Sequence, residues 1–398
     1  MLLPMPNPPV PPDSTAPVHV IGAGPGGLAV AAALAQRGIR SVVVEKSPDV
    51  GASWRGHYEG LRLHTTRRWS ALPGLSIPRS AGRWVSRGDF VRYLEEYARH
   101  HRLDLAAGVE VFRMERAEGE DGWLLTATGG RRLRASAVVV ATGFNHTPRL
   151  PDWPGADGFD GELLHARSYR EPSPYAGRDV LVVGVGNTGA EIAAELSGSG
   201  TGRVWLSVRT PPHILRRATL GWPSQANAIL CRRLPVGLVD RAARPLARLL
   251  PDLSAQGLPR PEVGLYSRVL EGAIPVLDRG LVRAVKRRRV LPVAAVESFD
   301  GPRVLLADGT SLTPDVVIAA TGYRRGLEPL VGHLGLLDGE GRPLVHGRET
   351  HPAAPDLYFT GYSNPISGTL RELGRDAPRI AGAIASAAAD RRGTARRR

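Results

Sequence analysis

Two glycine-rich stretches with the spacing GxGxxG are the strongest chemical signal in this chain: Gly22, Gly24 and Gly27, then Gly184, Gly186 and Gly189. At this spacing the first glycine permits a tight turn, the second lets a pyrophosphate approach the backbone, and the third lets a helix pack closely on a strand. The free N–H groups at the start of that helix bind the phosphates. Each stretch therefore predicts a dinucleotide site.

The residues around the first stretch complete a strand–helix–strand unit. An apolar strand at 19–21 leads into the glycines, a helix at 28–37 follows, and a second strand at 41–44 ends in Glu45. A carboxylate at this strand end accepts hydrogen bonds from a ribose and would repel a 2′-phosphate. The first site is therefore predicted to bind FAD or NAD, and not NADP.

The second unit has the same order of elements and the opposite charge at the strand end. A strand at 179–183, a helix at 190–196 and a strand at 203–208 are followed by Arg209. A guanidinium can pair with a phosphate through two hydrogen bonds, so Arg209 predicts NADPH, with Arg216 and Arg217 as further candidates. The alternative is that Arg209 is a solvated arginine at a strand end.

Two buried strands must position these sites. The segments 137–143 and 316–322 are apolar and both end in Ala-Thr-Gly, and a β-meander pattern precedes each, at 123–133 and 303–312. Such strands return the chain beside a nucleotide, which places Thr142, Gly143, Thr321 and Gly322 near the cofactors. The predicted fold class is α/β, with two nested Rossmann-like dinucleotide-binding domains.

These elements define the domain organisation. We expect a disordered extension at 1–17, a discontinuous first domain at 18–150 and 323–390, a second domain at 151–322, and a basic tail at 391–398. The first domain closes with a strand at 357–360, Gly361 and a helix at 375–389.

An insert around 211–268, with an amphipathic stretch at 239–250, is expected to contact substrate or to form a surface subdomain or dimer contact. A membrane-associating helix is a further alternative for that stretch.

Composition narrows the class of protein. The hydrophobic fraction of 42% and charged fraction of 23% are those of a soluble globular protein, and no stretch reads as a membrane span or signal peptide. The single cysteine, Cys231, excludes an internal disulfide and the redox cysteine pair that a disulfide reductase needs, and argues against a cysteine-based metal site. We predict a cytoplasmic protein without a metal.

The net charge of +14 could indicate nucleic acid or an anionic membrane as partner. Arginine is scattered through a chain rich in Ala, Gly and Pro, which favours biased codon usage instead. A basic cluster at 286–289 lies at the end of a helix-like segment just before a strand, where cations are electrostatically favoured, and a second lies at 396–398. No nucleic-acid motif accompanies them, so no nucleic-acid partner is predicted.

A segment between the two units resembles a known family. Phe159, Gly161, His165 and Tyr169 match the FxGxxxHxxx(Y/F) pattern of class B flavin monooxygenases. Related Baeyer–Villiger enzymes usually have Trp in place of Tyr169, so the chain resembles the flavin-containing monooxygenase branch. Over roughly residues 18–385 it looks similar to the plant YUCCA-type auxin enzymes and their bacterial relatives. The segments that carry this are 62–64, 186–192, 207–215 and 272–278, and 315–323 resembles a motif shared with N-hydroxylating monooxygenases.

The resemblance implies FAD at the first site, NADPH at the second, and a flavin-side loop at 51–55. It implies that NADPH reduces FAD, that a C4a-hydroperoxyflavin forms with dioxygen, and that this species oxygenates a small molecule at N or S or decarboxylates an aryl-pyruvate. His165 would link the domains and position NADP. Arg67 lies where many relatives place an Asn near the flavin, and we predict it as catalytic. Further residues expected to bind cofactor are Gly26, Lys46, Trp54, His64, Asn187 and Thr188.

Two other classes of function stay open. One is an NADPH oxidase or flavin reductase that does not insert oxygen; the missing Asn supports it, and the pattern around His165 argues against it. The other is a non-catalytic nucleotide sensor, against which both intact glycine loops argue. A homodimer is a further expectation. The Arg and Ala content is typical of GC-rich bacterial genomes, where such enzymes serve secondary metabolism.

Overall fold

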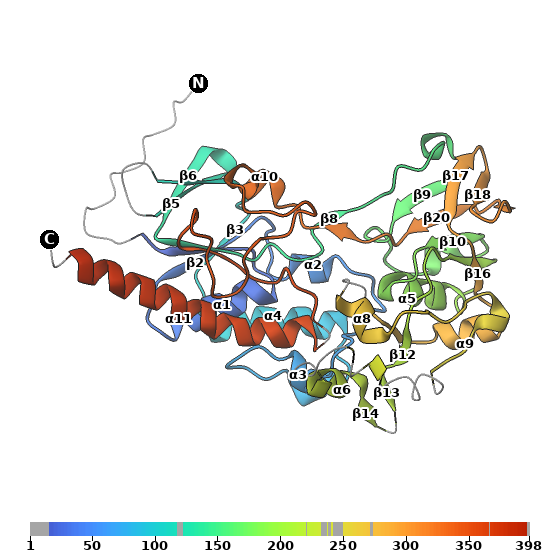
Figure 1. Ribbon diagram of the computed structural model, residues 1–398, viewed down its shortest axis with the longest axis horizontal. Coiled ribbons are helices and arrows are strands. Elements are labelled where there is room, and N and C mark those ends of the chain that lie inside the picture. The colour runs from blue at the N-terminus through green and yellow to red at the C-terminus, as the bar shows by residue number, and fades with distance from the viewer. Residues whose placement is uncertain are drawn as a thin grey trace.

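The computed structural model describes residues 16–117, 122–219, 221–231, 237, 240–241, 250–270, 274–365 and 367–395. Most of the predicted N-terminal extension and of the amphipathic stretch at 239–250 lies outside these residues. Two parallel sheets of five strands each lie at opposite ends of the molecule (Figure 1). Within the described residues, none of the helices is long and apolar enough to cross a membrane. The cytoplasmic location stays a prediction.

The first sheet has the strand order β22-β7-β1-β2-β3. Its strands are β1 (Val18–Ile21), β2 (Ser41–Glu45), β3 (Leu105–Ala107), β7 (Ala137–Val140) and β22 (Leu357–Phe359). The central strand β1 is buried along its whole length, as expected of a parallel strand covered on both faces. Val18 pairs with Ser41 on one side and Ala137 on the other, so the predicted Ala-Thr-Gly strand does lie beside the first glycine loop.

Helices cover this sheet. They are α1 (Pro25–Ala35), α4 (Arg87–His100) and α11 (Thr369–Ala395), and the short helices α2 (Ala52–Arg55), α3 (Arg67–Ser70) and α10 (Glu328–Val331) lie in the connections. α11 packs along α1 and buries Leu373, Ala377 and Ile380 in the same core as Leu28 and Val30. α11 begins before and ends after the predicted helix at 375–389. The residues 391–395, predicted as tail, are therefore helical.

The second sheet repeats the arrangement, with the order β16-β11-β10-β20-β9. Its strands are β9 (Glu162–His165), β10 (Val180–Val183), β11 (Val204–Ser207), β16 (Leu291–Val293) and β20 (Val316–Ala319). Val180 pairs with Val204 and with Val316, which matches the register around β1. The helices are α5 (Asn187–Leu196) and α9 (Leu281–Lys286); the basic cluster at 286–289 lies at the end of α9, as predicted.

Smaller sheets connect and extend these two units. The predicted meanders are three-stranded antiparallel sheets: β4 (Val111–Arg116), β5 (Trp123–Ala127) and β6 (Arg131–Ala135), then β17 (Val296–Asp300), β18 (Arg303–Leu306) and β19 (Ser311–Leu312). The chain passes between the units through β8 (Thr147–Pro148) and β21 (Tyr323–Arg324), which pair antiparallel. Both crossings follow directly after an Ala-Thr-Gly strand.

The insert around 211–268 and the segment just after it form short elements, some of them between the two units and some below the units in Figure 1. These are β12 (Ile214–Arg216), β13 (Ala218–Thr219), β14 (Trp222–Pro223), α6 (Ser224–Cys231), α8 (Leu265–Leu270) and β15 (Val276–Asp278). β12 and β15 pair in parallel, so two of the segments that carry the family resemblance lie side by side.

Candidate functional site

One large cavity connects the carboxyl ends of the two central strands. Its volume is about 1810 Å³, whereas pockets for one small molecule are about 300–1,000 Å³, so there is room for more than one ligand. The carboxyl edge of a parallel sheet is where α/β folds bind ligands. The predicted site residues in the cavity wall are Gly22, Gly24, Gly26, Glu45, Lys46, Trp54, His64, Thr142, Gly143, His165, Gly186, Asn187, Thr188, Gly322 and Gly361.

The glycines of the first loop have three different physical roles. Gly22 has φ +108°, and a Cβ there would lie 2.6 Å from the Ala141 carbonyl oxygen. A Cβ on Gly27 would lie 1.9 Å from the Gly22 carbonyl oxygen, so the helix can approach the strand only without a side chain. A Cβ on Gly24 would meet nothing within 4 Å, because this residue faces open space.

The second loop repeats these distances. Gly184 has φ +105°, and its Cβ would lie 2.6 Å from the Ala320 carbonyl oxygen. A Cβ on Gly189 would lie 1.9 Å from the Gly184 carbonyl oxygen, and Gly186 faces open space. Three of these glycines, Gly27, Gly184 and Gly189, do not line the cavity. They allow the close backbone contacts that set the conformation of the two loops.

The wall beside the first loop has the polar groups that FAD requires. α1 begins after Gly24 without a side-chain cap, which leaves its first N–H groups free for phosphate. Thr360 is 1% exposed and lines the cavity, and its Oγ1 has no hydrogen-bond partner among the described residues. Glu45 accepts hydrogen bonds from the backbone N–H of Ala23 (2.7 Å) and Ser47 (2.9 Å), which fix the carboxylate beside the loop. These residues fit FAD.

Other predicted residues of this half hold the wall together. Lys46 Nζ lies 3.2 Å from His146 Nε2. Trp54 packs edge to face on Phe90, with their ring centres 4.5 Å apart. Thr142 donates its backbone N–H to the hydroxyl of Tyr362 at 3.1 Å, a contact that the sequence analysis missed.

The second loop also fits a nucleotide. α5 begins at Asn187, whose side chain accepts from Leu277 N (2.8 Å) and donates to the Pro275 carbonyl (3.1 Å), so it joins the loop to β15.

The three arginines proposed for the 2′-phosphate differ in placement. Arg209 is exposed, outside the cavity wall, and has no ion-pair partner in the part of the chain that the structure describes. Arg216 lines the cavity. Arg217 is engaged elsewhere: its guanidinium lies 4.2 Å from the Trp84 ring centre and donates to the Leu63 carbonyl at 2.6 Å.

His165 ends β9 and connects the wall to the crossing between the units. Its Nε2 lies 3.0 Å from the Gly322 carbonyl oxygen, and its Nδ1 accepts from Arg167 N at 3.0 Å. This pattern requires the neutral tautomer with the proton on Nε2. Burial is the main cause that lowers the pKa of His165, which agrees with a neutral ring. Thr321, outside the wall, donates its hydroxyl to the Arg149 carbonyl and so braces the same crossing.

Arg67 does not reach the cavity wall. Its guanidinium donates to the Ile77 carbonyl at 2.9 Å, and its backbone N–H donates to the Arg83 carbonyl at 2.8 Å. These contacts hold the loop around α3, and they suit a structural role better than the predicted catalytic one.

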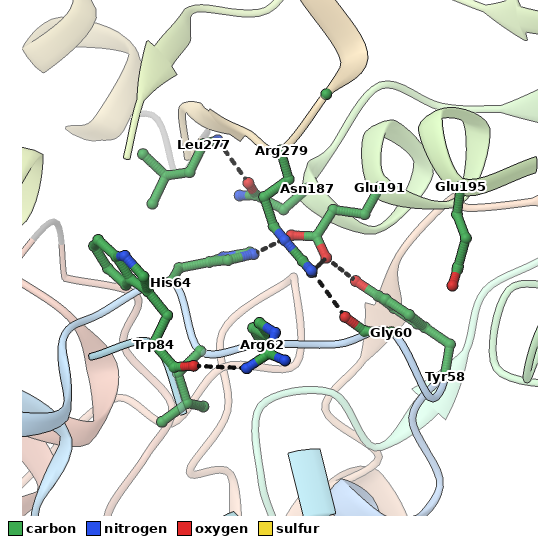
Figure 2. A network of polar contacts seen from close by, with 12 residues as sticks. Tyr58, Gly60, Arg62, His64, Trp84, Asn187, Glu191, Glu195, Leu277 and Arg279 are labelled. Atoms are coloured by element: carbon green, nitrogen blue, oxygen red, sulfur yellow. Dashed lines mark hydrogen bonds and ion pairs between the residues drawn. The ribbon is translucent and has the colours of Figure 1, made fainter. Parts of the chain in front are cut away.

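The sequence analysis missed a buried carboxylate at the centre of a polar network (Figure 2). Glu191, on α5, is 6% exposed. Its Oε1 lies 2.6 Å from His64 Nε2, and its Oε2 accepts from the Tyr58 hydroxyl at 2.9 Å and from Arg279. Burial alone would raise the pKa of Glu191, but the hydrogen bonds from His64 and Tyr58 and the positive charge of Arg279 together lower it. The sequence offered one indication of this buried carboxylate, because in the segment 190–193 the acidic residue is flanked only by apolar residues.

Comparison with known proteins agrees with this geometry. A family model described as pyridine nucleotide-disulphide oxidoreductase matches residues 19–216. The chain is 36% identical over 351 residues to indole-3-pyruvate monooxygenase YUCCA1 of Oryza sativa subsp. japonica, covering 86% of each chain. It is 35% identical over 382 residues to YUCCA8 of Oryza sativa subsp. indica, covering 92% of this chain and 90% of the relative. A mutant flavin monooxygenase from Stenotrophomonas maltophilia superposes with a TM-score of 0.73 at 26% identity, covering 94% of this chain and 98% of that chain.

Fold and site together define a flavoprotein oxidoreductase with two dinucleotide sites. The chain belongs to the YUCCA-like branch of the class B flavin monooxygenases. It is an NADPH-dependent flavin monooxygenase, with FAD and NADPH as cofactors, and it acts on a small-molecule substrate with dioxygen.

Proposed function

We propose that the substrate is an aryl-pyruvate, such as indole-3-pyruvate, and that the reaction is its oxidative decarboxylation. In this reaction the 2-oxo acid, dioxygen, NADPH and one proton give the acid with one carbon fewer, carbon dioxide, NADP⁺ and water. Support comes from the substrate named for the relatives that are 35–36% identical over most of the chain. N- or S-oxygenation of an amine or thioether is the alternative.

The observation that carries this proposal is the composition of the cavity wall beyond the two loops. The insert supplies a large part of it, including Leu215, Arg216, Gln225 and Ala228. Arg62, from the first unit, also lines the cavity. Arginine guanidinium groups bind carboxylates through paired hydrogen bonds, and apolar residues beside them suit an aromatic ring, so the insert is proposed to contact the substrate.

The cofactor residues have proposed roles that follow from their positions. The loop at 22–27 and the free Thr360 hydroxyl would bind the pyrophosphate of FAD, and Glu45 its ribose. The loop at 184–189 would bind the pyrophosphate of NADPH, with Arg209 on the 2′-phosphate. Bound FAD supplies the redox and oxygen chemistry; the chain orients the ligands and excludes water. Accordingly, 18–150 with 323–390 forms the proposed FAD domain, and 151–322 the proposed NADPH domain.

The test is a product analysis with purified protein, NADPH and indole-3-pyruvate in air. We expect NADPH consumption to match formation of indole-3-acetate, with little hydrogen peroxide. Consumption of NADPH without this product would contradict the proposed substrate, and a panel of amines and thioethers would then test the alternative. The predicted homodimer is tested separately, by light scattering of the eluting protein.

A further inference from the structure

The cluster around Glu191 joins the two units at the cavity. His64, Tyr58 and Gly60 belong to the first unit, whereas Glu191 and Arg279 belong to the second. Figure 2 shows His64, Tyr58 and Arg279 converging on the Glu191 carboxylate. Arg279 also donates to the Gly60 carbonyl at 2.9 Å. The second unit therefore binds both side chains and the backbone of the segment 58–64.

Tyr58 and His64 of the cluster both line the cavity, and His64 is the more exposed of the two. The His64 side chain is 27% exposed. An ionised carboxylate only accepts hydrogen bonds, so the 2.6 Å contact with Glu191 requires the proton on Nε2 of His64. The other ring nitrogen, Nδ1, has no hydrogen-bond partner among the described residues.

We infer that Glu191 is a positioning residue that holds His64 with Nε2 protonated and so presents Nδ1 as a hydrogen-bond acceptor to an N–H or O–H group of a ligand in the cavity. A carboxylate that fixes the tautomer and orientation of a histidine is a common device in enzymes and metal sites. The identity of the ligand that His64 contacts rests on the proposed function. The tautomer of His64 does not, because it follows from the contact with Glu191.

The position of Glu191 gives this arrangement a consequence. Glu191 lies on α5, whose first residues, Asn187 and Thr188, line the second nucleotide site. The orientation of His64 is therefore tied to the helix that begins at that site.

Glu195 offers a matched control on the same helix. It also faces this loop: a Cβ on Gly60 would lie 2.6 Å from its Oε1. Its Oε2 accepts from the Tyr169 hydroxyl at 3.1 Å, and it makes no contact with His64 among the described residues. Burial is the main cause that raises the pKa of Glu195, whereas that of Glu191 is lowered.

The first test is the tautomer of His64 in flavin-loaded protein labelled with ¹⁵N-histidine, with the His64 signals assigned from H64Q. We expect Nε2–H and an unprotonated Nδ1 in the wild type and in E195Q, and a mixture of tautomers in E191Q. Nδ1–H in the wild type would overturn the inference even if E191Q failed to fold. An unchanged tautomer in folded E191Q would overturn it as well.

The second test separates positioning from binding. With NADPH and air, E191Q is expected to lower kcat for NADPH oxidation about tenfold, in line with the losses seen when the orienting partner of a histidine is removed, while KM for NADPH changes less than about twofold. E195Q is expected to stay within about twofold of the wild type in both. A rise in KM alone, or equal losses in the two variants, would overturn the inference. Failure of indole-3-pyruvate as substrate would leave both tests unaffected.

Discussion

The glycines of the second loop allow a prediction that separates folding from nucleotide binding. Gly186→Ala and Gly189→Ala add the same methyl group three residues apart. A Cβ at Gly189 would lie 1.9 Å from the Gly184 carbonyl oxygen, well inside the closest contact that real Cβ atoms make. Gly186 has φ −70° and ψ 177°, which alanine adopts without strain, and a Cβ there meets nothing within 4 Å.

The two variants should therefore fail in different ways. Overpacking of this kind costs about 1–3 kcal/mol, so Gly189→Ala should lower Tm by roughly 2–12 °C at about 2–4 °C per kcal/mol. Gly186→Ala should leave Tm of the NADP⁺-free protein within about 1 °C. Its methyl group occupies the space into which the pyrophosphate comes closest, so the Kd for NADP⁺ should rise at least about tenfold, or about 1.4 kcal/mol.

Thermal unfolding without NADP⁺ and calorimetric titration with NADP⁺ measure the two effects. The wild type, Gly186→Ala and Gly189→Ala are compared at the same flavin content. The reasoning would be refuted by a Gly186→Ala protein that unfolds early, or by a Gly189→Ala protein with wild-type Tm. A Gly186→Ala protein that binds NADP⁺ as tightly as the wild type would refute the placement of the nucleotide.

Three further predictions follow from single side chains. Arg209→Ala should lower kcat/KM for NADPH by about tenfold to a hundredfold, the value of hydrogen bonds to a charged group, and leave kcat/KM for NADH unchanged; equal losses with both would show that Arg209 does not bind the 2′-phosphate. His165→Ala removes the contacts to the Gly322 carbonyl and Arg167 N and should raise KM for NADPH while flavin content stays constant; loss of flavin instead would contradict this role. Burial lowers the pKa of His19 to about 4, from the 6.5 of an unperturbed histidine, so between these values the unfolded chain binds more protons and acidification destabilises the fold. Between pH 7.5 and 5, His19→Asn should lose about 2 kcal/mol less unfolding free energy than the wild type in urea titrations, and equal losses would contradict the buried neutral ring.

The sequence predicted the central strands and glycine loops because steric demands there admit few residues. Only glycine satisfies the 1.9 Å approach at Gly27 and Gly189, and the strands beside the loops are short runs of buried apolar residues. The first strand of each meander, β4 or β17, was missed because buried and exposed residues do not alternate regularly along it. The pair β12–β15 was missed because strands of three residues carry little periodicity.

Site residues were predictable where a sequence motif fixes the backbone. They were less predictable where the conformation of a long side chain determines which groups it contacts. Arg67 and Arg217 belong to segments near the cavity, yet their guanidinium groups turn to the carbonyls of Ile77 and Leu63. The Glu191 cluster depends on residues far apart in the chain, Tyr58, His64 and Arg279, which only the docking of the two units brings together. No local pattern contains that information.

The central claim, that this chain is a monooxygenase, is tested most directly by the fate of the oxygen. The purified protein is given NADPH and indole-3-pyruvate under ¹⁸O₂, and the acid product and hydrogen peroxide are quantified against the NADPH consumed. The account predicts one ¹⁸O atom in the carboxylate of the indole-3-acetate formed, with product and NADPH in near-equal amounts. Recovery of all NADPH electrons as hydrogen peroxide, with no ¹⁸O in any product from this substrate or from amines and thioethers, would contradict it.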